Sequence, residues 1–406
     1  MNPSAVTIRS PHAQIESESL ASLQPGRLLS LDLFRGLTIA FMILVNNAGD
    51  FTLAYRPLHH AFWNGFTPTD LVFPAFLFIV GITTLLSLSS RLSRGITKRE
   101  LFLQVLKRAV ILFLLGILVN SFPLFDLPTM RFVGVLQRIA ICYLVVATFY
   151  LLSPGWRDKA AIMAGLLIGY WMLMRFVPVP GYGVPTHSVP LLDRDGNLSA
   201  WLDHQIFSTP HLFQGQGKGD PEGVLGTLPA IGTTLLGMLT GQWLRTSRSL
   251  MRKVRGIAIA GIIAVLLGGL WNFTFPINKR LWTSSYVLFA GGLSLLLLAL
   301  SILLVVDDGS AVESGPQRYR GSRFFTPLTV FGTNAIAAYV FSELLSSTLN
   351  SIHTYAGINL QQTLYRAIVS IAPDTAFASL LYSLGFVAVC WIFTYVLYRN
   401  RIFIKI

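Results

Sequence analysis

Apolar segments about twenty residues long recur along almost the whole chain, and they constrain its fold more than any other feature. A helix needs roughly 20 apolar residues to cross the hydrocarbon core of a bilayer. Only 12% of the 406 residues are charged, whereas soluble domains carry about 25% charged residues. We therefore predict an all-α fold, that of a polytopic integral membrane protein with about ten transmembrane helices. The predicted spans are residues 29–48, 70–90, 106–121, 132–152, 159–177, 223–243, 255–275, 281–306, 326–349 and 377–398.

The positions of the basic residues predict the orientation of the chain. The net charge is +13, and cytoplasmic loops of membrane proteins collect Lys and Arg. Most of the 31 basic residues fall on one side if both termini are cytoplasmic, which is the predicted topology. This topology and anionic lipids account for the charge surplus better than a nucleic-acid partner does, so we expect membrane lipids and no nucleic acid. Residues 1–26 are predicted to be a disordered cytoplasmic tail and residues 27–406 one transmembrane domain.

Two connections are predicted to lie on the outer side of the membrane. Residues 178–222 form a long loop rich in Pro, Gly and Asp, which we expect to cover an outward-facing site. Residues 350–376, which include Gln361, Gln362 and Arg366, are predicted to hold an amphipathic helix at the interface. A site beneath the long loop would face away from the cytoplasm.

A histidine and a carboxylate lie between the first two predicted spans. His60 opens the run His-Ala-Phe-Trp-Asn-Gly, and Asp70 stands at the start of the second span. A neutral imidazole is available as a base or nucleophile near neutral pH, and a carboxylate can orient it. A structural histidine that hydrogen-bonds at the membrane interface is the more common role of such a residue. No metal site is expected, because the adjacent side chains of His59 and His60 diverge and the other histidines lack ligand spacing.

Polar side chains inside the spans are costly there and are candidates for function. Asp32 and Arg35 share one helical face of the first span, where a structural ion pair and a role in chemistry stay open as alternatives. Gln137 and Arg138 fall in the fourth span. Arginine suits bidentate recognition of a ligand phosphate, and a buried ion pair is an equal alternative. Asn46 brings an amide to the outer end of the first span.

Six short motifs in a fixed order point to a known family. They are Asp32–Gly36, His60–Gly65, Asp70–Pro74, Gly134–Arg138, Asp220–Gly226 and Asn278–Trp282. With these motifs the chain resembles the transmembrane acyltransferase family of heparan-α-glucosaminide N-acetyltransferase, which includes bacterial members associated with amino-sugar use. The resemblance covers residues 27–406. It implies a membrane acyltransferase that moves acetyl from cytoplasmic acetyl-CoA to the amine of an amino sugar or glycan at the outer face.

The resemblance also implies roles for particular residues. Catalytic roles fall on His60, Asp70 and Asn46, with Asn64 as a second candidate hydrogen-bond donor to the oxyanion. Acetyl-CoA is the implied co-substrate, without a metal, and Lys405 matches a terminal lysine implicated in binding the CoA phosphates. Further candidates for the CoA site are Arg35, Gln137 and Arg138. Candidates for the acceptor site are Trp63, Asp220, Glu222, Lys279 and Trp282. The same resemblance implies a homodimer in a bacterial inner membrane.

Other classes of function and two mechanisms stay open on the sequence. About ten spans with glycines inside them, such as Gly232 and Gly237, are also typical of a secondary transporter of sugars or related small solutes. A non-catalytic glycan sensor would need no CoA site, so CoA binding separates it from an enzyme, and counterflow of labelled sugar would identify a transporter. For an enzyme, His60 can attack the thioester itself or act as a general base in a ternary complex.

Overall fold

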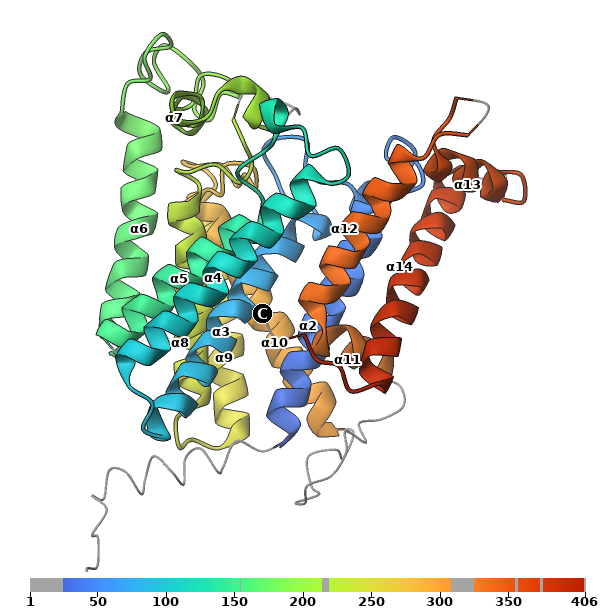
Figure 1. Ribbon diagram of the computed structural model, residues 1–406. Helices are drawn as coiled ribbons and strands as arrows, with labels where there is room; N and C mark the ends of the chain where they lie inside the picture. The colour runs from blue at the N-terminus through green and yellow to red at the C-terminus, as the bar shows by residue number, and fades with distance from the viewer. Residues whose placement is uncertain are drawn as a thin grey trace, which may run out of the picture.

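The computed structural model describes residues 25–153, 155–213, 219–307, 325–354, 357–372 and 375–404. In these residues the chain is a helical bundle without a β-sheet (Figure 1), which confirms the predicted all-α, polytopic membrane class. The predicted tail falls almost entirely outside the described residues, as does Lys405. The long helices are α2 (Pro25–Asn46), α3 (Val72–Ser93), α4 (Lys98–Ser121), α5 (Val135–Leu152), α6 (Trp156–Phe176), α8 (Thr227–Leu244), α9 (Leu250–Trp271), α10 (Ser284–Asp307), α12 (Ala335–Ser351) and α14 (Thr375–Arg399). Shorter helices are α7 (Leu198–Ile206), α11 (Thr326–Thr333) and α13 (Leu360–Val369).

The number of membrane-crossing helices is smaller than the predicted ten. Within the described residues, 8 helices are long and apolar enough to cross a membrane, or 9 if the bent pair α11 and α12 is one span. The remaining predicted span, 223–243, is helix α8, which is less apolar because it carries several Thr and Gly residues. Thr233 and Thr234 are fully buried, and α8 packs against α3, α5 and α6. Neighbouring helices therefore cover much of α8, so it needs less apolar surface than a lipid-facing helix.

The break between α11 and α12 anchors the C-terminal segment. The two helices meet at an angle of 85°. Asn334 at the break donates its side-chain amide to the Ile402 carbonyl at 3.1 Å and accepts the Ile404 N–H at 3.0 Å. The residues after α14 accordingly turn back toward α2 and α11 (Figure 1). The Asn334 side chain thus holds the segment after α14 against the break between α11 and α12.

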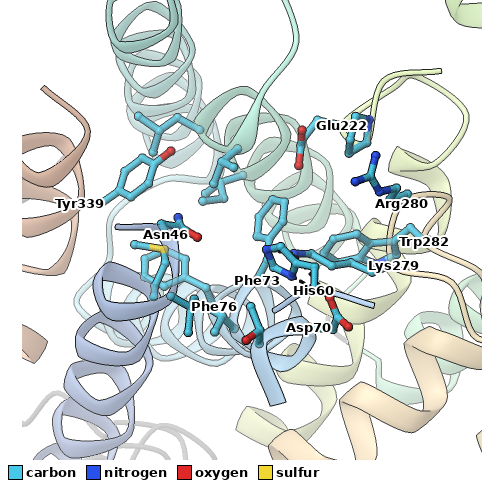
Figure 2. A pocket seen from close by; sticks show the side chains of 18 of the residues that line it. Asn46, His60, Asp70, Phe73, Phe76, Glu222, Lys279, Arg280, Trp282 and Tyr339 are labelled. Carbon is cyan, nitrogen blue, oxygen red and sulfur yellow. Dashed lines mark hydrogen bonds and ion pairs between the residues drawn. The ribbon is translucent and has the colours of Figure 1, made fainter. Parts of the chain in front are cut away.

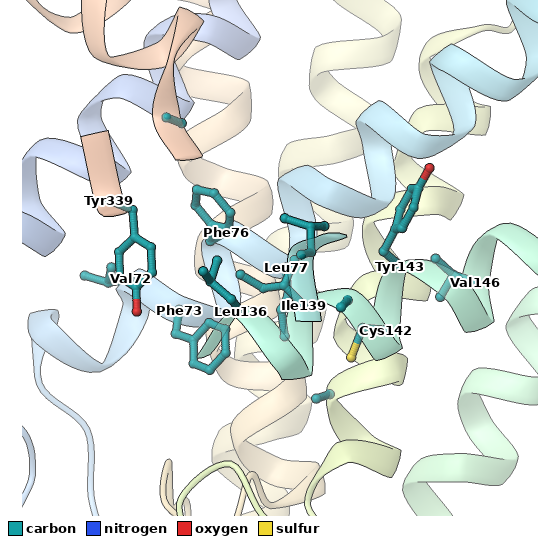
Figure 3. Packing of buried hydrophobic residues seen from close by; sticks show 14 of the residues in the cluster. Val72, Phe73, Phe76, Leu77, Leu136, Ile139, Cys142, Tyr143, Val146 and Tyr339 are labelled. Carbon is teal, nitrogen blue, oxygen red and sulfur yellow. The ribbon is translucent and has the colours of Figure 1, made fainter. Parts of the chain in front are cut away.

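The largest apolar core lies between α3, α5 and the elements around them. Figure 3 shows Phe73, Phe76 and Leu77 of α3 against Leu136 and Ile139 of α5, which lie side by side with buried apolar side chains. Several of these residues also face the cavity described below. The core therefore fixes the position of the cavity wall.

The two ends of the bundle differ in their connections. The segment between α6 and α8, with α7, lies at the same end as α13 (Figure 1). The segment predicted to hold an amphipathic helix does contain one, α13. The start of α2 and the end of α14 lie at the opposite end (Figure 1). Which end faces the cytoplasm stays a prediction from the basic residues.

Candidate active site

A cavity of about 310 Å³ opens between α2, α3, α5, α12 and the connecting segments (Figure 2). Much of its wall is apolar, and polar groups lie on more than one side of it (Figure 2). The apolar wall includes Ile39, Met42, Val45, Val72, Phe73, Phe76, Val135, Leu136, Ile139 and Ile336. The polar groups belong to Asn46, His60, Thr69, Asp70, Arg131, Glu222, Lys279 and Arg280. Such a cavity suits a ligand with an apolar arm and a polar reacting end.

His60 and Asp70 form a hydrogen-bonded pair on this wall. The His60 Nδ1 atom lies 2.8 Å from Asp70 Oδ1, and the Asp70 side chain is almost completely buried. Asp70 Oδ2 accepts three further hydrogen bonds of 3.0 Å, from the Ala61 N–H and from the N–H and hydroxyl of Thr67. These donors hold the carboxylate in one orientation. A carboxylate so placed favours the tautomer with hydrogen on Nδ1, which leaves Nε2 of His60 as the acceptor.

Lys279 lies against the imidazole of His60. Its Nζ atom is 3.0 Å from Nδ1 and 3.2 Å from Nε2, and 3.9 Å from Asp70 Oδ1. The two similar distances to the ring nitrogens place the ammonium over the face of the ring. Burial lowers the pKa of His60, and the positive charge of Lys279 lowers this pKa further, against the opposing effect of Asp70. Burial also lowers the pKa of Lys279 to about 8. His60 is therefore a neutral imidazole at neutral pH.

The loop that carries His60 is tied to the segment between α9 and α10. Asn64 Oδ1 accepts a hydrogen bond of 3.0 Å from the Asn278 amide, and the Gly65 N–H donates to the Ile277 carbonyl at 2.8 Å. Gly65 has a φ of 117°, which favours glycine. Asn64 is not among the residues that line the cavity. Asn64 therefore holds the His60 loop against the segment between α9 and α10.

The segment between α6 and α8 is fastened to the His60 loop. Trp63 lines the cavity, and its indole N–H donates to the Leu192 carbonyl at 2.8 Å. The guanidinium of Arg194 lies 4.2 Å from the ring centroid of Phe62 and 5.5 Å from that of Trp63. The predicted cover over an outward site, residues 178–222, thus contacts the loop that bears His60.

Asp220 and Glu222 are both engaged by Arg131, a residue that the sequence did not single out. The Arg131 Nε atom donates to Asp220 Oδ2 at 2.7 Å, and Nη2 donates to both carboxylates. Glu222 and Arg131 line the cavity, whereas Asp220 is buried behind them. Asp220 therefore orients Arg131 rather than facing a substrate. Nothing in the sequence links Arg131 to a partner 89 positions away.

Trp282 lines the cavity, and Arg138 supports it from behind. The Arg138 guanidinium is buried, donates to the Gly223 carbonyl at 3.0 Å and lies 5.1 Å from the Trp282 ring centroid. The Trp282 N–H donates to the Thr233 hydroxyl at 3.1 Å. Neither Arg138 nor Gln137 reaches the cavity wall. In this arrangement Arg138 fixes the aromatic wall.

The predicted CoA contact Arg35 belongs to another part of the molecule, and Lys405 lies outside the described residues. Arg35 donates to Asp32 at 3.2 Å and to the Gly332 carbonyl at 3.0 Å, beside the break between α11 and α12. The C-terminal segment is bound at the same break up to Ile404, next to Lys405 in the chain. Arg35 is not on the cavity wall.

Asn46 and Tyr339 lie across the cavity from Lys279 and Trp282 (Figure 2). Asn46 ends α2, and its side chain hydrogen-bonds to Glu343 of α12. Tyr339 of α12 and Arg280 complete the wall, and sequence reasoning missed both residues. The structure thus gathers His60, Asp70 and Asn46 around one cavity.

The apolar helices of the bundle define a multi-pass membrane protein, and its cavity holds a neutral imidazole that is oriented by a carboxylate. The family model described as heparan-alpha-glucosaminide N-acetyltransferase, catalytic, matches residues 27–269, and the chain belongs to this family. The human heparan-alpha-glucosaminide N-acetyltransferase is 32% identical over 378 residues, which cover 80% of this chain and 54% of the human protein. The mouse protein is 31% identical over 374 residues, which cover 79% and 54%. The chain therefore spans about half the length of these relatives. The predicted family is confirmed.

Proposed function

We propose that the protein transfers an acetyl group from acetyl-CoA to the amine of an amino sugar or glycan, with His60 as base or nucleophile. The observation that carries this proposal is the buried Asp70 carboxylate that orients a neutral His60 on the wall of an apolar cavity. The names of the human and mouse relatives give the acetyl group and a glucosaminide acceptor for those proteins. Membership of an acetyltransferase family favours this function over a transporter or a sensor.

The site supplies the groups that acyl transfer needs. In the general-base route, the acceptor amine attacks the thioester carbonyl, His60 Nε2 takes the amine proton, the C–S bond breaks and the CoA thiolate leaves and is protonated. In the nucleophilic route, His60 Nε2 bonds to the carbonyl carbon, the C–S bond breaks and the CoA thiolate leaves. The amine then attacks the acetyl-imidazole and displaces the imidazole, and the proton that the amine loses ends on the CoA thiolate. Asn46 and Lys279 are the cavity donors that can stabilise the oxyanion in either route.

The topology supports one arrangement of the two substrates. The apolar wall from α2, α3 and α5 accepts the pantetheine arm, and the phosphates lie toward the end of the bundle where the C-terminal segment is anchored. Lys405 and Arg35 are the proposed basic partners at that end. The acceptor then approaches from the opposite end of the bundle. We also propose that the protein is a homodimer and that it lies in a bacterial inner membrane.

Incubation of the purified protein with radiolabelled acetyl-CoA and glucosamine, followed by analysis of the products, tests this function. We expect N-acetylglucosamine and an equal amount of free CoA, and no acetylated product with glucose, which lacks the amine. CoA binding without turnover of glucosamine would indicate another acceptor. An absence of CoA binding together with counterflow of labelled sugar would replace the proposal with a transporter.

The pH dependence of kcat/KM should follow the fraction of His60 that is neutral. A base whose pKa lies below the ordinary value of 6.5 is active above that pKa and loses activity as the pH falls through it. We expect kcat/KM, expressed per unprotonated glucosamine, to show an acidic limb with its midpoint below 6.5. In a Lys279→Met variant the limb should move to higher pH, because the nearby positive charge is gone. An acidic limb at the same pH in both proteins would contradict this assignment.

A further inference from the structure

A second cavity, of about 460 Å³, lies between the end of α2 and helices α12, α13 and α14. Its wall is largely polar, in contrast to the apolar wall of the first cavity. The lining residues are Asn46, Asn47, Ala48, Gly49, Asp50, Phe51, Ser346, Asn350, Asn359, Gln361, Gln362, Tyr365, Arg366 and Tyr382. Amides, hydroxyls, one carboxylate and one guanidinium therefore surround this space. The mechanism described above uses none of them except Asn46.

Asn46 belongs to the wall of both cavities. The residues that follow it, up to Phe51, continue along the second cavity. On the facing helix α12, Glu343 hydrogen-bonds to Asn46, and Ser346 and Asn350 line the second cavity one and two turns further on. The two cavities thus meet at Asn46, and the first of them holds His60.

Hydrogen bonds between distant segments hold the second cavity in shape. The Gln361 amide of α13 donates to the Gly49 carbonyl at 2.9 Å, which ties α13 to the chain after α2. The Asp50 N–H donates to the Ser379 hydroxyl of α14 at 3.1 Å, and this hydroxyl donates to the Asp50 carbonyl at 3.0 Å. A Cβ atom on Gly49 would lie 2.5 Å from the Tyr365 ring, so this ring packs closely on the backbone. The cavity is therefore preformed.

The groups on the wall match a sugar that carries hydroxyls and an amine. Asn and Gln side chains both donate and accept hydrogen bonds, as vicinal hydroxyls require. The N–H and hydroxyl of Thr52 donate to Asp50 Oδ1 at 2.7 Å, and the hydroxyl bond lowers the pKa of Asp50. Asp50 is therefore an anion at neutral pH, which attracts a sugar ammonium group before it loses its proton. Tyr365 and Tyr382 add aromatic surface for the ring carbons.

We propose that this second cavity binds the ring hydroxyls of a hexosamine acceptor and presents its amine past Asn46 to the cavity that holds His60. Asp50 and Arg366 provide the charged contacts, and the amides near Asn359 and Gln362 provide the neutral ones. The inference rests on the proposed acetyl transfer for its reaction, but sugar binding to this cavity can be measured without turnover.

Asp50→Asn and Arg366→Gln test the proposal, with glucosamine as the probe. Asparagine keeps an oxygen for Thr52 and removes the charge. The control is Asp126→Asn, an outer-loop carboxylate that accepts the Thr129 hydroxyl at 2.6 Å and lines neither cavity. We expect Asp50→Asn to raise the KM for glucosamine about tenfold or more, the loss of a charged hydrogen bond, and to leave the KM for acetyl-CoA unchanged. We expect a smaller rise in Arg366→Gln and none in Asp126→Asn.

Saturation-transfer NMR of glucosamine on each detergent-solubilised protein separates the two proposals. Sugar signals that weaken in Asp50→Asn but not in Asp126→Asn support the acceptor cavity, even if the wild type transfers no acetyl group. In that case only the acetyl transfer fails. Equal glucosamine KM values in all variants, or sugar signals that do not depend on Asp50, would overturn the acceptor cavity even if acetyl transfer is intact.

Discussion

An Asp70→Asn variant is expected to lose about three orders of magnitude in kcat while it still folds. The Asp70 carboxylate accepts four hydrogen bonds, from His60, the Ala61 N–H and two groups of Thr67. An asparagine has one acceptor oxygen and one donor NH₂, so it cannot satisfy all of them. If the oxygen stays with the Thr67 and Ala61 donors, the NH₂ faces His60 Nδ1 and favours the tautomer with hydrogen on Nε2. That tautomer cannot take a proton from the acceptor. The rate of N-acetylglucosamine formation, measured with saturating acetyl-CoA, reports the loss.

A Thr67→Val variant is the matched control for Asp70→Asn. It removes one hydroxyl, whose proton is shared between the His59 carbonyl at 2.7 Å and Asp70 Oδ2 at 3.0 Å, but keeps the carboxylate and its bond to His60. We expect a loss of about 1 kcal/mol in unfolding free energy and a kcat within about tenfold of the wild type. Thermal unfolding in detergent verifies that both variants fold. An Asp70→Asn protein that folds and retains wild-type kcat would show that the carboxylate does not orient a catalytic base.

A Gly36→Ala variant is expected to lose about 3 kcal/mol of stability, because α2 and α11 touch backbone to backbone. A Cβ atom on Gly36 would lie 1.7 Å from the backbone carbonyl oxygen of Leu328. A Cβ atom on Gly332 would lie 2.0 Å from the backbone carbonyl oxygen of Asp32. Two facing glycines thus let these helices approach closely, as small residues do in membrane bundles. The contact lies beside the Arg35 bond to Gly332 and the Asn334 anchor of the C-terminal segment. Thermal unfolding of the purified protein measures the effect.

Gly165→Ala in α6 is the control, because no atom lies within 4 Å of the added Cβ. Alanine is favoured over glycine in a helix by about 1 kcal/mol, so this variant should match or exceed the wild-type stability. If Gly36→Ala unfolds at the same temperature as Gly165→Ala, the close contact between α2 and α11 does not exist in the folded protein.

Local patterns were enough to predict much of this molecule. Helix length and apolarity predicted most of the long helices to within about five residues, because the bilayer imposes a minimum length on each span. Helix α4 begins eight residues before the predicted span 106–121, and the predicted span 326–349 is the bent pair α11 and α12. The pairing of His60 with Asp70 was predictable because only a short loop separates them in the sequence. The family resemblance implied a catalytic role for Asn46, which the structure places on the same cavity wall.

Contacts between distant segments could not be predicted from the sequence. Arg131 hydrogen-bonds to Asp220, and Asn64 to Asn278, only because separate loops meet at one end of the bundle. Arg138 was proposed as a phosphate ligand because a guanidinium inside a span needs a partner. The contacts of Arg138 with the Trp282 ring and with the Gly223 carbonyl could not be predicted, because these residues are distant in the sequence. The polarity of α8 lowered the number of apolar spans because its Thr and Gly residues face other helices.

The most direct test of the central claim compares His60→Ala with His59→Ala in the acetyl-transfer assay. The two histidines are adjacent, but His59 lines neither cavity and its Nε2 atom contacts the Ala54 carbonyl at 2.8 Å. Acetyl-CoA, glucosamine and both products are quantified under single-turnover and steady-state conditions. We predict that kcat falls in His60→Ala by at least as much as in Asp70→Asn, about 10³-fold or more, and stays close to wild type in His59→Ala. Equal acetyl transfer by the two folded variants would contradict a catalytic role for His60.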